Sequence, residues 1–168
     1  MTNILHTGRF IELVATNGWE FVRRRNASAV VSIIATTPAG ELLLVEQHRM
    51  PVGGSVIELP AGLVGDEQAD EDILVAAARE LVEETGWEPT TCQILTRGPS
   101  SAGLTSEIST LIRASGLRQV GAGGGVAGEA ITVHTIPVPA VPKWLAERAR
   151  NGVLVDHKIH AALWWLHV

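Results

Sequence analysis

The sequence predicts an α/β protein in which a mixed β-sheet lies between helices, an α/β/α sandwich, with a β-hairpin in front of it. Two observations lead to this fold class. Short runs rich in apolar and β-branched residues recur along most of the 168-residue chain, as expected of strands. A run at helical spacing interrupts them before Gly86, and two more helical runs close the sequence. Helices can therefore cover both faces of one sheet, and the length suits a single domain.

The N-terminal half contains a hairpin followed by further strands. Asn17-Gly18 lies between two short extended runs and is a strong signal for a two-residue hairpin turn. The run 29–35 has the length and β-branching of a buried strand, and residues 38–40 turn the chain into the next one. The predicted strands are 10–14, 19–23, 29–35, 41–47 and 56–59.

The C-terminal half begins with the central helix. Acidic residues between 66 and 72 suit the positive end of its dipole, and Gly86 has the position of a C-cap glycine. The glycine-rich residues 121–125 are predicted to be the most flexible segment. They are not a dinucleotide-binding fingerprint, because the spacing differs and a strand follows. The predicted elements are strands 91–95, 106–114 and 131–136 and helices 143–150 and 156–166.

Composition excludes several classes of function. A net charge of −5 argues against general nucleic-acid binding, which needs a basic surface. No run approaches the ~20 apolar residues of a membrane span, and the N-terminal residues lack a secretory signal, so we expect no membrane partner. The single cysteine, Cys92, fits a reducing cytoplasm, and its alternating apolar surroundings favour a buried structural thiol. The six histidines form no metal-binding pattern.

Three acidic side chains share one face of the central helix. At about 100° per residue, Glu80, Glu83 and Glu84 fall within roughly one third of its circumference. Like charges at this spacing repel each other, so the pattern does not stabilise the helix by itself. A hard divalent cation would remove the repulsion, because Mg²⁺ and Mn²⁺ prefer carboxylate oxygens. An ordinary amphipathic helix with a solvated acidic face is the alternative.

The spacing around these glutamates resembles the signature of the Nudix hydrolases. Five residues separate Gly65 from Glu71, seven more separate Glu71 from Arg79, and RELVEETGW follows without interruption. The preceding Pro-Ala-Gly favours Gly62 as the first glycine of the signature, whereas counting favours Gly65. The resemblance implies a Nudix-type α/β/α sandwich over residues 28–168, with residues 1–27 as a hairpin extension.

The resemblance also assigns roles within a divalent-metal site for Mg²⁺ or Mn²⁺. Glu80 and Glu84 match the principal metal ligands of the family. Glu83 would support them or hold a further ion, and the backbone carbonyl of Ala61 would complete the shell. Such a site suits attack of water on a diphosphate.

The remaining family roles concern orientation and proton transfer. Arg79 would pair with the carboxylates and orient them. Glu71 would contact metal through water or cap the helix, and these two roles stay open. In the ADP-ribose pyrophosphatase branch of the family, the catalytic base comes from a mobile loop. This loop matches residues 120–130, and Glu129 is its carboxylate. Glu83 is the alternative base.

Further segments resemble the ADP-ribose pyrophosphatase branch. The match implies that Arg49 reaches the diphosphate, that Glu58 lies in the same site, and that Glu107 is near the terminal ribose. Trp19 and Glu20 resemble a pair that holds adenine by stacking and hydrogen bonding. In this branch the N-terminal hairpin crosses to a second subunit, so a homodimer is implied.

The function implied is Mg²⁺-dependent hydrolysis of ADP-ribose, or of a related nucleoside diphosphate sugar, to AMP and a sugar phosphate. The small-molecule partner is then a nucleotide sugar. One alternative is a Nudix hydrolase of another nucleotide, such as a nucleoside triphosphate, a dinucleoside polyphosphate or a GDP-sugar. The other is a non-catalytic module that senses ADP-ribose.

Overall fold

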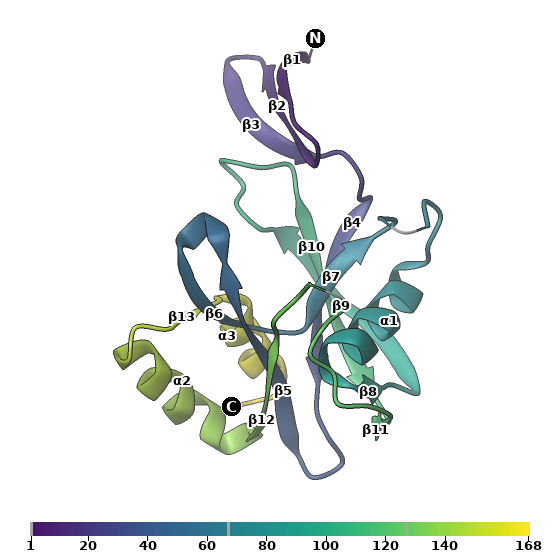
Figure 1. The fold of residues 1–168 in the computed structure, drawn as a ribbon, viewed down its shortest axis with the longest axis vertical. Coiled ribbons are helices and arrows are strands. Elements are labelled where there is room, and N and C mark those ends of the chain that lie inside the picture. Colours follow the sequence, from purple (N-terminus) through teal and green to yellow (C-terminus); the bar gives the residue numbers. More distant parts are fainter. Residues whose placement is uncertain (1, 67, 127) are drawn as a thin grey trace.

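The structure is a computed structural model that describes residues 2–66, 68–126 and 128–168. An N-terminal sheet stands away from a larger body, in which two four-stranded sheets are flanked by helices (Figure 1). Among the described residues, no helix is both long and apolar enough to cross a membrane.

The N-terminal sheet is antiparallel in the order β1-β2-β3. The hairpin turn predicted at Asn17 and Gly18 is confirmed: the φ angles are 51° and 83°, the left-handed values that a two-residue turn requires. A third strand was not predicted, because its residues are all exposed and carry no pattern of burial. The strands are β1 (Asn3–Thr7), β2 (Ile11–Thr16) and β3 (Trp19–Arg24).

The body contains two mixed sheets where the sequence predicted one. The first has the order β7-β4-β10-β9 and the second β12-β5-β6-β13, and each mixes parallel and antiparallel pairs. β4 and β5 are joined by a tight turn and pair only through the isolated bridge between Thr36 and Leu42. The strands of the body are β4 (Ala29–Ala35), β5 (Glu41–Arg49), β6 (Gly54–Glu58), β7 (Ala61–Val64), β9 (Thr91–Pro99), β10 (Ile108–Ser115), β12 (Thr132–Pro137) and β13 (Leu154–Val155), with β8 (Trp87–Glu88) pairing β11 (Arg118–Gln119) at one side.

The helices cover opposite faces of these sheets, which confirms the α/β/α sandwich. α1 (Ile73–Thr85) packs on one face, where alternate residues of β4 such as Ile33 meet Leu81 in one core cluster. The next residue of β4, Ile34, faces a second cluster with α2 (Val141–Arg150) and α3 (Lys158–Trp165). Both sides of β4 are therefore buried, and each large aliphatic side chain in these clusters stabilises the fold by about 1.5–3 kcal/mol. Short 3₁₀ turns occur at η1 (Met50–Val52) and η2 (Val138–Ala140).

Both ends of α1 are fixed by local hydrogen bonds. The Asp72 carboxylate accepts from the N–H groups of Leu74 at 2.9 Å and Val75 at 3.3 Å, so Asp72 is the N-cap. The acidic stretch before it precedes the helix rather than forming its first turn. Gly86 adopts φ 75° and donates its N–H to Val82 O, which confirms it as the C-cap.

The glycine-rich residues 121–125 are docked, contrary to the expectation that they form the most flexible segment. The N–H groups of Gly124 and Gly125 donate to the carbonyls of Glu84 at 2.8 Å and Glu83 at 3.0 Å. These carbonyls belong to the last turn of α1, which has no further helical partners. A Cβ at Gly123 would lie 2.4 Å from the backbone of Thr85, so a glycine is needed for the backbones to approach. Residue 127, within the loop predicted at 120–130, lies outside the described residues.

The C-terminal helices agree with their predicted positions to within two residues. β13, between them, was not predicted because it is only two residues long. Cys92 is half-buried against the α1 core cluster rather than fully buried, and burial raises the pKa of its thiol.

Candidate active site

The site is built where α1 passes β7. Gly62 of β7 faces Glu80 so closely that a Cβ at Gly62 would lie 1.9 Å from the Glu80 Cδ atom. Gly65, at the end of the same segment, adopts φ 81°, a conformation that favours glycine. Both glycines are thus constrained, Gly62 by contact with the site and Gly65 by the turn of the chain.

One guanidinium connects the carboxylates of this region. Arg79 donates to Glu71 at 2.9 Å from Nε and at 3.1 Å from a terminal nitrogen. The other terminal nitrogen donates to Glu80 at 3.1 Å and to Glu83 at 3.2 Å. This hydrogen bonding holds the pKa of Glu71 below its usual range and raises the pKa of Arg79. Glu71 therefore binds Arg79, and the helix-capping role considered for it belongs to Asp72.

Glu84 of α1 is buried, and Glu80 is partly buried. Their side chains lie one turn apart, and Glu84 is 5% exposed. Burial raises the pKa of Glu80 to about 7, with the charge of Glu83 adding to the shift and Arg79 opposing it. Burial likewise raises the pKa of Glu84 to about 8, although the Ala61 N–H donates to its Oε2 atom at 3.0 Å. Burial disfavours the ionised form of both carboxyl groups, and a bound cation would favour that form again.

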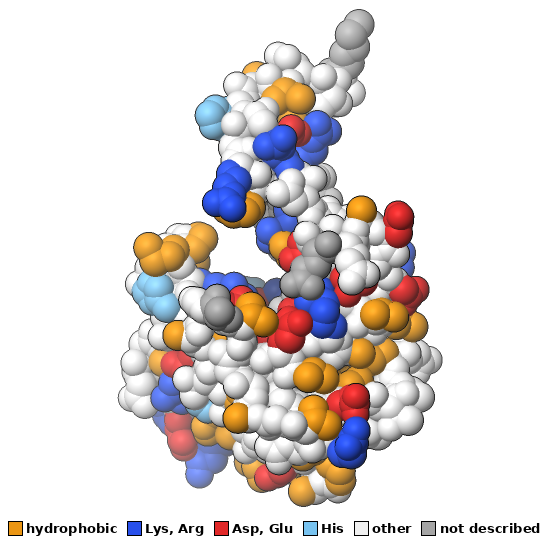
Figure 2. Space-filling view, turned by 45° about the vertical axis from the view of Figure 1, so that its right-hand side comes forward, with side chains coloured by type: hydrophobic (Ala, Val, Ile, Leu, Met, Phe, Trp, Pro, Cys, Tyr) orange, Lys and Arg blue, Asp and Glu red, His pale blue; other side chains and the backbone are white. Residues whose placement is uncertain are grey.

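An arginine and a glutamate form the opposite wall. Arg49, at the end of β5, donates from Nε to Glu58 of β6 at 2.7 Å. The two side chains line a cavity of about 400 Å³ that also reaches Ala61, the backbone partner of Glu84. Figure 2 shows acidic and basic side chains gathered around a hollow below the N-terminal sheet. The charge of Arg49 lowers the pKa of Glu84, which places the two groups within electrostatic range of each other.

The two acidic residues expected from loops lie at different distances from this centre. The charge of Glu129 contributes to the raised pKa of Glu84, so the two carboxylates are neighbours. Glu129 also accepts from the Val126 N–H at 3.1 Å, which holds it within its own loop. Glu107 binds Arg24 of β3 at 2.5 Å, and this pair lines the same cavity as Arg49.

The predicted adenine-binding pair is not at this centre within one chain. Trp19 is 65% exposed on the N-terminal sheet and lines a separate hollow with residues of the loop 102–106. Glu20, the next residue of β3, is exposed as well. Neither side chain lines the cavity of Arg49 and Glu58.

Sequence reasoning did not identify two charged residues that line this cavity, Asp156 and Lys158, which follow β13. Arg24, from the N-terminal sheet, lines the cavity as well. No spacing rule links these positions to the acidic helix, because strand pairing rather than sequence distance brings them together.

The donor set fits a hard divalent cation. Glu84 and the partly buried Glu80 offer carboxylate oxygens from one helix face, and Mg²⁺ commonly uses one or two protein carboxylates together with water and substrate phosphates. In the part of the chain that the structure describes, no three His, Cys, Asp or Glu side chains converge as a complete protein-only metal centre.

Comparison with known proteins gives a consistent set of similarities. The model of the NUDIX domain matches residues 26–120. A methanol dehydrogenase activator from Bacillus methanolicus is 39% identical over 102 residues, which cover 61% of this chain and 52% of the relative. An ADP-ribose pyrophosphatase from Mycobacterium tuberculosis is 36% identical over 123 residues, which cover 70% of this chain and 58% of the relative. The chain thus spans about half the length of the curated relatives it matches.

A crystal structure described as an ADP compounds hydrolase has a similar fold. The TM-score is 0.65 at 20% sequence identity, and the match covers 85% of this chain and 80% of that chain. At this identity the likeness shows the architecture of the sandwich.

Proposed function

This chain belongs to the Nudix family, and on that premise we propose that it hydrolyses the diphosphate bond of ADP-ribose or a related nucleoside diphosphate sugar. The products are AMP and a sugar phosphate. One observation carries the proposal: the buried Glu84 of α1 accepts from the N–H of Ala61, which lines the cavity of Arg49 and Glu58, and Glu80 lies one helical turn from Glu84. Carboxylates close to an arginine suit a diphosphate together with a divalent ion.

The relatives support the choice of substrate class. Proteins named ADP-ribose pyrophosphatase from Mycobacterium tuberculosis and Bacillus subtilis are 36% and 33% identical to matched parts of this chain.

Glu80 and Glu84 would hold Mg²⁺ or Mn²⁺, with Glu83 and the Ala61 carbonyl as further donors. A bound ion of this kind neutralises diphosphate charge and lowers the pKa of coordinated water. Arg79 orients three of the carboxylates by hydrogen bonding, so its role is positioning. The positions of these side chains in the structure are the basis of the ligand assignments.

Arg49 and Glu129 act on the substrate side of this cluster. The Arg49 guanidinium is half-exposed at the cavity and can donate to a phosphate oxygen while Nε keeps its bond to Glu58. Glu129 is the general base of the proposal, because its charge acts on Glu84 and helps to raise the pKa of that carboxyl group. Its bond to the Val126 N–H must break or lengthen for it to reach a water molecule. Glu83 is the alternative base.

The N-terminal residues 1–27 complete the site from a second copy of the chain. Trp19 is exposed and remote from the acidic cluster of its own chain, and apolar side chains of the same sheet are also exposed. A homodimer would cover these side chains and bring Trp19 and Glu20 to the adenine of the neighbouring site, with Glu107 near the terminal ribose. A single cysteine is compatible with a reducing cytoplasm as the compartment.

The test is hydrolysis of ADP-ribose with Mg²⁺, compared with ADP-glucose, GDP-mannose, NADH and 8-oxo-dGTP. We expect release of AMP from ADP-ribose by the wild-type chain and its loss in Glu84→Gln. If the chain hydrolyses another of these substrates but not ADP-ribose, the assignment of the metal site still holds and the choice of ADP-ribose as substrate is overturned. Binding of ADP-ribose without turnover of any substrate would identify a sensing module instead.

The adenine assignment has its own test. Trp19→Ala is expected to raise the KM for ADP-ribose about tenfold or more, because stacking of a base on an aromatic ring is worth ~1–3 kcal/mol. An unchanged KM would remove Trp19 from the site. Trp164→Ala is the matched control, since Trp164 is 68% exposed on α3 and lines neither hollow.

A further inference from the structure

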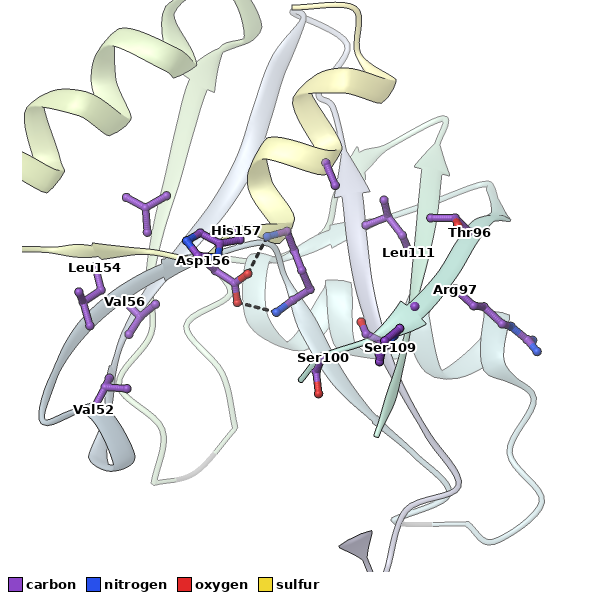
Figure 3. A pocket seen from close by; sticks show the side chains of 15 residues that line it. Val52, Val56, Thr96, Arg97, Ser100, Ser109, Leu111, Leu154, Asp156 and His157 are labelled. Atoms are coloured by element: carbon purple, nitrogen blue, oxygen red, sulfur yellow. Dashed lines mark hydrogen bonds and ion pairs between the residues drawn. The ribbon is translucent and has the colours of Figure 1, made fainter. Parts of the chain in front are cut away.

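The cavity of Arg49 and Glu58 continues into a larger one of about 730 Å³ (Figure 3). The larger cavity extends away from the acidic helix towards α3 and β13. Nothing in the assigned site uses it. The residues that line both cavities are Val52, Val56, Ser100, Ser109, Asp156 and Lys158.

Asp156 is fixed beside the assigned site by strand pairing. β13 runs parallel to β6, with Val155 opposite Ile57. The next residue, Asp156, donates its N–H to the Ile57 carbonyl at 2.9 Å and so lies next to Glu58. Neighbouring strands are about 4.8 Å apart, so Asp156 is one strand spacing from the residue that binds Arg49.

Asp156 and Lys158 form a pair with unused hydrogen-bonding capacity. The Lys158 Nζ atom donates to one Asp156 oxygen at 2.5 Å, and the Lys158 N–H donates to the other at 2.7 Å. An ammonium has three donors and a carboxylate about four acceptor positions, so both groups can bind further partners. The side chain of Lys158 is 37% exposed and that of Asp156 18% exposed, and both residues line the larger cavity, in which Figure 3 labels Asp156.

The rest of the wall is mainly apolar, with a few hydroxyl groups and the side chains of Arg97 and His157. Val52 and Leu154 are 56% and 48% exposed, which leaves apolar surface open to a ligand. Ser100 and Ser109 add hydroxyl groups. Among the described residues that line the two cavities there is no Phe or Trp on which a nucleobase could stack. The lining suits a ring with C–H edges and several hydroxyl groups.

We infer that Asp156 and Lys158 bind the distal sugar of a nucleoside diphosphate sugar and select an uncharged sugar with adjacent hydroxyl groups. Adjacent hydroxyls can donate to the Asp156 carboxylate and accept from the Lys158 ammonium at the same time. A distal phosphate or carboxylate would be repelled by the negative charge of Asp156. Lys158 would not offset this repulsion, because its positive charge is already balanced by Asp156. The inference rests on the proposed function, because it takes the diphosphate to lie at Arg49.

The test compares ligands that share the ADP half and differ in the distal group. For Lys158→Met we expect the KM of ADP-ribose and ADP-glucose to rise about tenfold, while the inhibition constant of ADP changes less than about twofold. For Asp156→Asn we expect the preference for ADP-glucose over ADP-glucuronic acid to fall about tenfold. Lys143→Met is the control, because Lys143 is the other lysine of the chain, is exposed on α2 and lines neither cavity.

Equal losses for ADP-ribose and ADP in Lys158→Met, or no change for either, would overturn the inference. Calorimetric binding of ADP-ribose and ADP gives the same comparison without turnover. If the wild type hydrolyses none of these substrates, the proposed function fails. A Lys158-dependent difference in binding between ADP-ribose and ADP would still support the distal sugar site. Thermal unfolding of each variant identifies any loss that comes from misfolding, and Asp156→Asn tests the same wall independently of Lys158→Met.

Discussion

Glu84→Gln separates the charge of this buried side chain from its shape. The amide keeps an oxygen that can accept the Ala61 N–H, now bonded at 3.0 Å, but it does not ionise. Burial raises the pKa of Glu84 from 4.5 to about 8. Between these values the folded wild type retains a proton that the unfolded chain has released. The metal-free wild type must therefore lose stability as the pH rises through this window.

The magnitude follows from the size of the shift. One pKa unit corresponds to about 1.4 kcal/mol. Raising the pKa from 4.5 to about 8 lowers the free energy of unfolding by about 3 to 4 kcal/mol between pH 5 and pH 8. Glu80, with its pKa raised to about 7, adds to the same slope. We expect metal-free Glu84→Gln to be about 3 kcal/mol more stable than wild type at pH 8 and within about 1 kcal/mol of it at pH 5.

Urea unfolding in EDTA, followed by the fluorescence of the five tryptophans, measures this difference. Glu88→Gln is the control, because Glu88 pairs with Arg118 on the surface and should keep the wild-type pH dependence. Under the proposed function, Mg²⁺ should stabilise the wild type at pH 8 and have little effect on Glu84→Gln. The reasoning is refuted if Glu84→Gln keeps the wild-type pH slope or is the less stable protein at pH 8.

Three further substitutions test the packing around α1. Arg79→Lys should lower kcat at least about 100-fold, because an ammonium cannot bind three carboxylates in the planar geometry of a guanidinium; near-normal kinetics would contradict the positioning role. Gly62→Ala should weaken Mg²⁺ binding about tenfold, measured by calorimetry, since the added Cβ would displace the side chain of Glu80. Gly54→Ala is the control and should bind Mg²⁺ as the wild type does, because a Cβ there meets nothing within 4 Å. Gly123→Ala should destabilise the fold by roughly 1–3 kcal/mol more than Gly128→Ala, because both glycines have positive φ and only Gly123 is packed against other atoms. Equal losses of unfolding free energy in chemical denaturation would show that backbone strain, and not this packing, causes the destabilisation.

The acidic helix could be predicted because its determinants are local. The 3.6-residue period places Glu80 and Glu84 on one face, and Gly86 provides the left-handed residue that ends the helix. The contact from Arg79 to Glu83 also follows from helical spacing. These features depend on neighbours within two turns, so sequence periodicity is sufficient to find them.

The features that sequence reasoning missed depend on pairing between distant strands. The length and β-branching of 29–35 predict a buried strand, but they do not show that β4 and β5 separate into two sheets. β13 has only two residues, yet its pairing with β6 brings Asp156 to the assigned cavity. The glycines at 121–125 suggested flexibility because glycine allows many backbone conformations. Hydrogen bonding to the end of α1 holds this segment in one of them.

The contact between the glycine-rich segment and the end of α1 is made by main-chain atoms on both sides. Its hydrogen bonds join the N–H groups of Gly124 and Gly125 to carbonyls of residues whose side chains face the proposed metal. Removing a carboxyl group by mutation therefore leaves the anchor of the neighbouring loop unaltered. Glu129 follows the anchored glycines by only a few residues, so its reach is set by the length of the chain between them. Under the proposed function, the backbone length of this segment limits how near Glu129 can come to the diphosphate.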